Sequence, residues 1–152
     1  MNVREASDLM GAANESLSAE LFDKEITDFS IDSRSVKAGE LFFALSQEDY
    51  ARAGFNGSFH DGHNYIAGAF RSGAIAAVAR ADRVHGDQGL LALCDRLLLV
   101  EDCIAALQTL AHRVYEAWGK RVVGITGSAG KTTAKELTAH LLQRRRPARF
   151  EE

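Results

Sequence analysis

A glycine-rich segment in the last third of the chain constrains the fold more than any other feature. It reads Thr126-Gly127-Ser128-Ala129-Gly130-Lys131-Thr132-Thr133. It lies between a predicted strand over 121–126 and a predicted helix from Thr132 onward. A glycine-rich turn between a strand and a helix is typical of α/β domains that bind phosphate at a helix N-terminus. The segment therefore predicts an α/β unit with a phosphate-binding loop.

The residue types in this loop suit ATP. Glycines let backbone N–H groups surround a phosphate, and the helix N-terminus adds a favourable dipole. Lys131 is the expected catalytic cation at the β- and γ-phosphates, and the Thr132 hydroxyl is the expected Mg²⁺ ligand. The predicted ATP-binding residues are Gly127, Ser128, Ala129, Gly130, Lys131, Thr132 and Thr133. The general pattern has glycine where Ile125 stands, so a glycine-rich turn with an incidental lysine is the alternative.

The rest of the chain alternates short apolar strands with amphipathic helices. Strands are predicted over 26–31, 41–45, 74–79 and 97–100, and helices over 3–10, 61–72 and 103–118. Asn2, Asp61 and Asp102 are the expected helix caps. Residues 46–61 read as a long loop and 81–89 as a polar connection. This alternation predicts an α/β architecture with at least partly parallel strands.

Composition excludes several classes of protein. The chain has 152 residues, 46% of them apolar, and a net charge of −3, which gives no sign of a nucleic-acid partner. No apolar run is long enough to insert in a membrane, and the N-terminus lacks the pattern of a secretory signal. Cys94 and Cys103 lack the spacing of a zinc site. We therefore expect a cytoplasmic protein with reduced thiols.

Two separated stretches resemble the Mur ligases, which are ATP-dependent amide-bond ligases of peptidoglycan synthesis. The first stretch contains Asp32-Ser33-Arg34, the strand 41–45 and Asp61-Gly62-His63. The second is 124–133, and loops of this family also lack the early glycine that Ile125 replaces. Two motifs in the family order are more specific than either motif by itself.

The resemblance implies a domain organisation. Residues 1–119 correspond to a UDP-sugar substrate-binding domain with a small mixed sheet and a linking helix. Residues 120–143 correspond to the first strand, P-loop and helix of a truncated ATP-binding α/β domain. Residues 144–152, rich in arginine, are expected to be a disordered basic tail. A chain of this extent is expected not to be a competent ligase.

The resemblance also implies a reaction. Ser128, Lys135-Glu136 and the strand 41–45 are most like the members that add D-alanyl-D-alanine to UDP-N-acetylmuramoyl-tripeptide. The expected cofactors are ATP and Mg²⁺, and the expected partners are the UDP-N-acetylmuramoyl-peptide and D-alanyl-D-alanine, bound by a monomer. Two alternatives stay open. One is the sister ligase that adds the third amino acid, and the other is a non-catalytic UDP-sugar-binding module.

Substrate residues come from the first stretch. By resemblance, Ser33 hydrogen-bonds the UDP end of the substrate, Arg34 contacts it by charge, and His63 lines its pocket. In the alternative interpretation, Asp32 caps a turn and pairs with Arg34. The chain departs from the family at Gln47 and has a longer stretch over 48–60, which is expected to change how the domain meets the sugar nucleotide.

Overall fold

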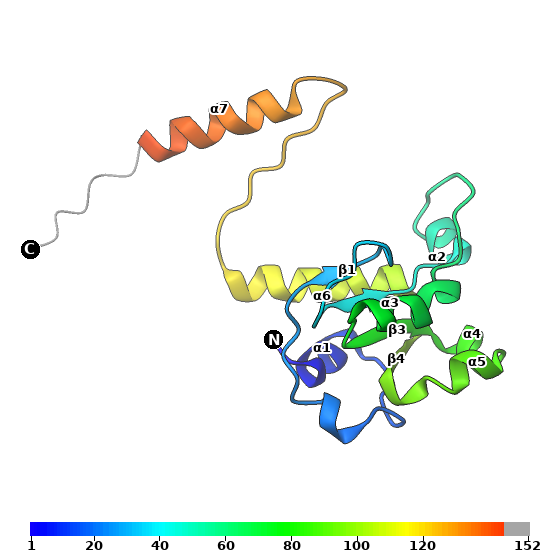
Figure 1. Cartoon of the computed structure of the whole chain (residues 1–152). Helices are drawn as coiled ribbons and strands as arrows, with labels where there is room; N and C mark the ends of the chain where they lie inside the picture. The colour runs from blue at the N-terminus through cyan, green and yellow to red at the C-terminus, as the bar shows by residue number, and fades with distance from the viewer. Residues whose placement is uncertain (145–152) are drawn as a thin grey trace, which may run out of the picture. The chain divides into compact units, whose positions relative to one another are not determined.

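The computed structural model of the chain describes residues 1–144. The chain divides into two compact units, Met1–Trp118 and the part from Gly119 onward. Apart from its first residue, the predicted basic tail lies outside the described residues. Figure 1 shows the fold of both units and labels most of their helices and strands.

Four short parallel strands form the sheet of the first unit. They are β1 (Phe29–Ser30), β2 (Leu41–Phe43), β3 (Ala76–Arg80) and β4 (Leu97–Val100), which lie side by side in chain order. Every neighbouring pair is parallel, so the expectation of a mixed sheet is wrong. The physical reason is that each connection crosses back to the end of the sheet where the previous strand began, so that every strand runs in the same direction. Within residues 1–144, antiparallel pairing is limited to the isolated bridges Asn2–Glu25 and Ala13–Leu99.

Helices fill most of the connections. The α-helices are α1 (Val3–Met10), α2 (Gln47–Arg52), α3 (Ile66–Ser72), α4 (Ala81–His85), α5 (Gln88–Leu91), α6 (Cys103–Trp118) and α7 (Lys131–Arg144). The 3-10 helices are η1 (Ala19–Leu21), η2 (Gly62–Tyr65) and η3 (Cys94–Arg96). In the part of the chain that the structure describes, no helix has the length and apolar character needed to cross a bilayer.

The predicted helix caps are confirmed. Asn2 Oδ1 accepts the backbone N–H of Glu5 at 2.8 Å, and the Glu5 carboxylate accepts the N–H of Asn2 at 2.9 Å. Asp61 accepts the N–H of His63 at the start of η2. Asp102 accepts the N–H of Ala105 at the start of α6. Each bond satisfies an N–H group that the first helical turn leaves without an internal partner.

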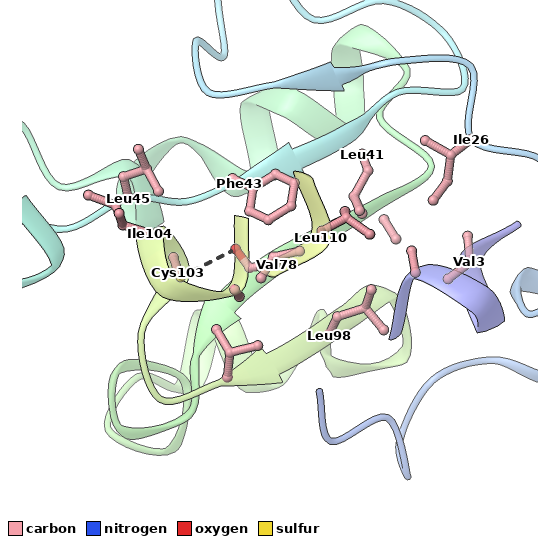
Figure 2. Close-up of a cluster of buried hydrophobic side chains, with 14 of the residues drawn as sticks. Val3, Ile26, Leu41, Phe43, Leu45, Val78, Leu98, Cys103, Ile104 and Leu110 are labelled. Atoms are coloured by element: carbon pink, nitrogen blue, oxygen red, sulfur yellow. Dashed lines mark hydrogen bonds between the residues drawn. The ribbon is translucent and has the colours of Figure 1, made fainter. Parts of the chain in front are cut away.

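Strand β2 shows how the sheet buries both of its faces. Its side chains point alternately to opposite sides. Leu41 and Phe43 pack with residues of α1 and α6 on one face, as Figure 2 shows. Phe42 packs with residues of α3 and α4 on the other. A strand covered on both faces needs a continuous apolar run, which explains the sequence Leu-Phe-Phe-Ala-Leu over 41–45.

Two segments that were expected to be a loop and a polar connection are partly helical. Helix α2 lies inside the predicted loop 46–61, and α4 and α5 lie inside 81–89. Periodicity misses them because they are short and bury few apolar residues. Helix α2 instead begins at a reciprocal cap, in which Ser46 Oγ accepts the N–H of Asp49 at 3.2 Å and the Asp49 carboxylate accepts the N–H of Ser46 at 2.7 Å.

The predicted strand over 121–126 is absent from the structure. These residues have no strand assignment, whereas the helix predicted after them is α7. A strand forms only when a neighbouring strand accepts and donates its backbone hydrogen bonds. Among residues 119–144 there is no second extended segment in a sheet to do so.

The apolar stripe of α6 is buried in only part of its length. Ile104 and Leu110 belong to the core of the first unit. Val114, Tyr115 and Trp118 are between 40% and 53% exposed, although their apolar spacing along the predicted helix 103–118 favours burial. The sheet is short, so it covers only the first turns of a 16-residue helix.

Candidate functional site

A pocket of about 480 Å³ opens at the carboxyl ends of β1 and β2. Three parts of the chain supply its walls: the turn after β1, the end of β2, and the stretch that runs from α2 to η2. Its lining residues are Ile31, Asp32, Ser33, Arg34, Phe42, Leu45, Tyr50, His60, Gly62 and Tyr65. Open α/β sheets bind their ligands at the carboxyl ends of their strands. This pocket brings the predicted substrate residues Ser33 and Arg34 together.

Asp32 organises the turn that carries these two residues. Its carboxylate accepts the backbone N–H of Arg34 at 3.0 Å and two guanidinium bonds, from Nε at 2.9 Å and Nη2 at 2.7 Å. These hydrogen bonds hold the pKa of Asp32 at about 2. The structure therefore shows the ion pair between Asp32 and Arg34 that the alternative interpretation predicts. The Arg34 side chain is 88% exposed, so its remaining N–H groups can still meet a ligand.

Ser33 differs from its neighbours because its hydroxyl is uncommitted. The residue is half-buried and lines the pocket, and no described group hydrogen-bonds its side chain. A hydroxyl in this position can donate to a phosphate oxygen or accept from a ligand N–H group.

Gly62 closes the pocket against the end of β2. Its N–H donates to the Leu45 carbonyl at 2.7 Å. A Cβ at this position would lie 2.7 Å from the Leu45 nitrogen and 2.9 Å from its oxygen, so only glycine allows this approach. The glycine of the Asp-Gly-His motif is thus required by the close approach of its backbone to Leu45.

His63 lies outside this pocket. Its side chain is 2% exposed, Nδ1 lies 2.7 Å from Asp61 Oδ1, and Nε2 accepts the backbone N–H of Arg80 at 3.0 Å. Since Nε2 accepts, Nδ1 carries the proton and donates to Asp61. Burial raises the pKa of Asp61, but hydrogen bonds from His63 and the charge of Arg83 outweigh it and lower the pKa overall. The structure thus gives His63 a role in joining η2 to β3, and it does not bring His63 together with Ser33 and Arg34.

Three carboxylates surround the buried Arg80 side chain. The Arg80 side chain, only 3% exposed, lies 2.6 Å from both Glu48 Oε2 and Asp82 Oδ2. The hydrogen bonds that Arg80 donates to the Asp82 carboxylate are the main cause that raises the pKa of Arg80, and they lower the pKa of Asp82 to about 2. Asp49 is fully buried and accepts the backbone N–H of Cys103 at 3.0 Å. This cluster fixes α2 to the end of β3 and to the start of α6, a connection that the sequence pattern does not reveal.

The phosphate loop belongs to the second unit. Gly130 has φ 74°, in the left-handed region that glycine adopts at no steric cost. The Ala134 N–H donates to the Gly130 carbonyl at 2.9 Å, which starts α7. The N–H groups of the first helical turn, at Lys131, Thr132 and Thr133, are consequently left for other acceptors. All residues from Gly127 to Thr133 are exposed.

Lys131 closes this loop on itself. Its ammonium group donates to the Gly127 carbonyl at 2.5 Å. Together with Thr132, Lys135, Val123 and Ile125 it lines a shallow pocket of about 260 Å³. A bound phosphate would compete with the Gly127 carbonyl for the same ammonium group.

Thr132 suits a metal that arrives with the nucleotide. Within residues 1–144, no three His, Cys, Asp or Glu side chains gather as a metal site. Mg²⁺ keeps several waters and takes one or two protein oxygens plus phosphate oxygens in such sites. A single hydroxyl in the first turn of α7 fits that arrangement, so Thr132 would hold the ion from the protein side.

Known proteins match most of the chain. No protein-family model matches the chain. The UDP-N-acetylmuramoyl-tripeptide--D-alanyl-D-alanine ligase of Synechocystis sp. is 38% identical over 121 residues, which are 79% of this chain and 23% of that protein. A MurF ligase from Thermotoga maritima, solved with ADP, aligns with a TM-score of 0.55 and 32% identity over 83% of this chain and 26% of its own. The chain is homologous to the N-terminal part of the Mur ligases.

Mur ligases of two kinds are similar to this chain. The UDP-N-acetylmuramoyl-L-alanyl-D-glutamate--2,6-diaminopimelate ligase of Mesorhizobium japonicum is 36% identical over 120 residues, 78% of this chain and 22% of that protein. MurF from Acinetobacter baumannii shares the fold, with a TM-score of 0.62 at 24% identity over 96% of this chain and 28% of its own. The chain spans less than a quarter of the length of these curated relatives.

Proposed function

We propose that this chain supplies the sugar-nucleotide site and the phosphate loop of an ATP-dependent ligase that adds D-alanyl-D-alanine to UDP-N-acetylmuramoyl-tripeptide. The observation that carries this proposal is the pocket at the carboxyl ends of β1 and β2, where Ser33 and Arg34 lie together. The same chain continues into the loop 127–133 and α7, in the order expected for a Mur ligase.

Each unit has a part in the proposed reaction. In the first, the Ser33 hydroxyl and the unpaired N–H groups of Arg34 bind the diphosphate of the sugar nucleotide. In the second, backbone N–H groups and the Lys131 ammonium bind the ATP phosphates, and Thr132 holds Mg²⁺. ATP supplies a phosphoryl group to the substrate carboxylate, and the amine of the incoming dipeptide displaces that phosphate from the acyl carbon. The chain's own contribution is positioning and charge stabilisation.

Calorimetric titration of the 152-residue chain tests the proposal. UDP-N-acetylmuramoyl-tripeptide and Mg²⁺-ATP are expected to bind at separate sites, so that saturation with one leaves the binding of the other measurable. Ser33→Ala is expected to weaken binding of the sugar nucleotide and to leave ATP binding unchanged. If the chain binds neither ligand, the proposal fails.

The sister ligase is a second candidate because diaminopimelate-adding relatives match at similar identity, 36% against 38%. The two candidates differ in the acceptor, which is UDP-N-acetylmuramoyl-L-alanyl-D-glutamate for the sister and the tripeptide for the first. Tighter binding of the dipeptide substrate would favour the sister ligase. Sugar-nucleotide binding without any ATP binding would instead favour a non-catalytic module. Sedimentation of the purified chain tests the expected monomer.

A further inference from the structure

Asn56 is the one asparagine of the chain that a glycine follows. The other three, Asn2, Asn14 and Asn64, precede a valine, a glutamate and a tyrosine. Glycine has no Cβ to shield its backbone nitrogen from the side chain before it. An Asn-Gly step is therefore the sequence at which a side-chain amide is lost most readily to attack by the next backbone nitrogen.

The groups that would react are accessible in the folded chain. Asn56 and Gly57 are both exposed and lie outside the helices and strands. No described group hydrogen-bonds the Asn56 side chain or the Gly57 N–H. The side-chain carbon and the backbone nitrogen that must meet are thus held by no other bond and are open to water.

Asp61-Gly62 is a comparable step that the fold protects. The Gly62 N–H donates to the Leu45 carbonyl at 2.7 Å. The Asp61 carboxylate accepts the backbone N–H of His63 at 3.0 Å. Ring closure at this step would break both bonds, so the two Xaa-Gly steps of the same stretch differ in how freely they can react.

The Asn-Gly step lies in the segment 47–60, here called the arm, which one side chain holds closed. Gln47 Nε2 donates to the Gly57 carbonyl at 3.0 Å, and Gln47 Oε1 accepts the N–H of Phe59 at 2.7 Å. The Phe59 ring stacks on the Tyr50 ring, with 3.9 Å between their centres. A Cβ at Gly57 would lie 3.3 Å from the Phe59 ring, so these residues are tightly packed. We call the two Gln47 hydrogen bonds the clasp.

We infer that Asn56 is a site of spontaneous deamidation and that its isoaspartate product opens the clasp. The Gly57 nitrogen attacks the side-chain carbonyl carbon of Asn56 and forms a new C–N bond. The amide nitrogen takes the Gly57 proton and leaves as ammonia, and a cyclic succinimide remains. Water then opens this ring. Cleavage at the side-chain carbonyl gives aspartate, and cleavage at the backbone carbonyl gives isoaspartate, in which the main chain runs through the former side chain.

The added length of isoaspartate is what opens the clasp. It places one more carbon in the main chain ahead of Gly57, which displaces that residue by about 1.5 Å. The 3.0 Å bond from Gln47 to the Gly57 carbonyl does not survive a lengthening of this size. Phe59 packs against Gly57 and moves with it, so the second bond is lost too. Tyr50 lines the pocket after β2, and that wall then loses its support.

Ageing of the 152-residue chain at neutral pH, followed by tryptic digestion and mass spectrometry, tests the deamidation. The peptide 53–71 contains Asn56, Asp61 and Asn64, so it reports the site and both comparisons together. We expect Asn56 to lose its amide about tenfold faster than Asn64, because Tyr65 shields its own nitrogen with a Cβ and a ring. Labelling by an isoaspartyl methyltransferase is expected at position 56 and not at position 61.

Asn56→Gln is the matched control for the chemistry, because its longer side chain must close a larger ring and is expected to stay unmodified. The loss at Asn56 is expected to be faster at mildly alkaline pH, since the deprotonated nitrogen is the attacking group. Equal rates at Asn56 and Asn64 would show that Asn56 is not a deamidation site.

Hydrogen exchange at the Phe59 amide tests the opening of the clasp. Gln47→Ala removes the clasp directly and is expected to speed this exchange about fivefold to tenfold. The isoaspartate form of the aged chain is expected to exchange at the same higher rate. Asn56→Asp adds the charge without the extra carbon, so it is expected to exchange as slowly as the fresh chain.

Thermal unfolding checks that each form keeps the fold of the first unit. If the isoaspartate form exchanges as slowly as the fresh chain, Asn56 is still a deamidation site and the opening of the clasp is wrong. If Gln47→Ala exchanges slowly as well, the clasp does not hold the arm and the opening is likewise wrong. Fast exchange in Asn56→Asp would assign the opening to the charge and contradict the role of the added carbon.

Discussion

The Lys131 ammonium group has a hydrogen-bond partner in the loop, and a bound phosphate would be a second one. The ammonium donates to the Gly127 carbonyl across the loop. A phosphate carries more negative charge than a carbonyl, and hydrogen bonds to charged groups are the stronger kind. We therefore propose that the lysine that closes the loop also binds the nucleotide.

The first prediction concerns this lysine. Lys131→Ala removes a charge-assisted hydrogen bond, so Mg²⁺-ATP binding is expected to weaken about tenfold to a hundredfold by calorimetry. Lys37→Ala, which removes an exposed lysine from the first unit, is the control. Equal ATP affinity in the Lys131→Ala chain and the parent would mean that the loop does not bind ATP.

The second prediction concerns Asp82, whose pKa the hydrogen bond from Arg80 lowers from 3.8 to about 2. A folded-state pKa below the unfolded value stabilises the fold above the unfolded pKa, and this contribution is lost as the pH falls through the folded pKa. Asp82→Asn is expected to lower the free energy of unfolding at pH 7 by only about 0.5 kcal/mol, because the Asp82 side chain is 61% exposed and solvent screens the pair.

Urea unfolding between pH 7 and pH 2 measures this effect. The difference between Asp82→Asn and the parent is expected to shrink as the pH falls from about 4 to about 2. Asp95→Asn, which changes an exposed carboxylate with no bond to Arg80, is the control. A difference that stays constant down to pH 2 would show that the charge of Asp82 does not stabilise the fold.

At the scale of elements, Asp49 joins three parts of the first unit. It caps α2 through Ser46, accepts the first N–H of α6 from Cys103, and lies 3.9 Å from Arg80 Nη1 at the end of β3. The pocket wall, the linking helix and the sheet are thus held by one buried carboxylate. Burial of a charge is tolerated only when such partners surround it.

The third prediction compares Asp49 with Asp102 at the same helix end. Asp49→Ala leaves the buried N–H groups of Ser46 and Cys103 without their acceptor and removes one of the carboxylates near Arg80, so the free energy of unfolding is expected to fall by about 3 kcal/mol. Asp102→Ala removes an accessible cap of α6 and is expected to cost about 1 kcal/mol. Urea unfolding of both variants gives the comparison, and equal losses would contradict the role assigned to Asp49.

At the scale of the whole molecule, the two units differ in how they are stabilised. The first unit has buried clusters on both faces of its sheet. No residue from Gly119 to Gln143 is buried. A single helix of this length is marginally stable in water by itself, so the stability of the described chain comes from the first unit.

The fourth prediction follows from this difference. A chain that ends at Trp118 is expected to melt within about 2 °C of the 152-residue chain, because both buried clusters consist of residues of the first unit. Circular dichroism during heating measures both. The same shortened chain is expected to keep its affinity for the sugar nucleotide and to lose ATP binding. A melting temperature several degrees lower would show that residues after Trp118 stabilise the first unit.

Helix starts, a buried strand and a glycine-rich turn could be predicted from the sequence, because each depends on residues close together in the chain. Asn2 and Asp102 predicted their helix starts, and the apolar run 41–45 predicted a buried strand. The loop 127–133 predicted a turn ahead of a helix, because glycine and the helix N-terminus act within a few residues. Ser33 and Arg34 were placed in the candidate site by family resemblance, and the structure brings them to one pocket.

Features that need contacts between residues far apart in the chain became visible in the three-dimensional structure alone. It made the sheet wholly parallel and left 121–126 without a strand, because backbone pairing needs a second segment. It shows that His63, which was expected to line the pocket, is instead buried and accepts the backbone N–H of Arg80. It also brought Tyr50 of the polar stretch after β2 to the pocket that Ser33 lines. Such contacts join residues far apart in the chain, and no local pattern records them.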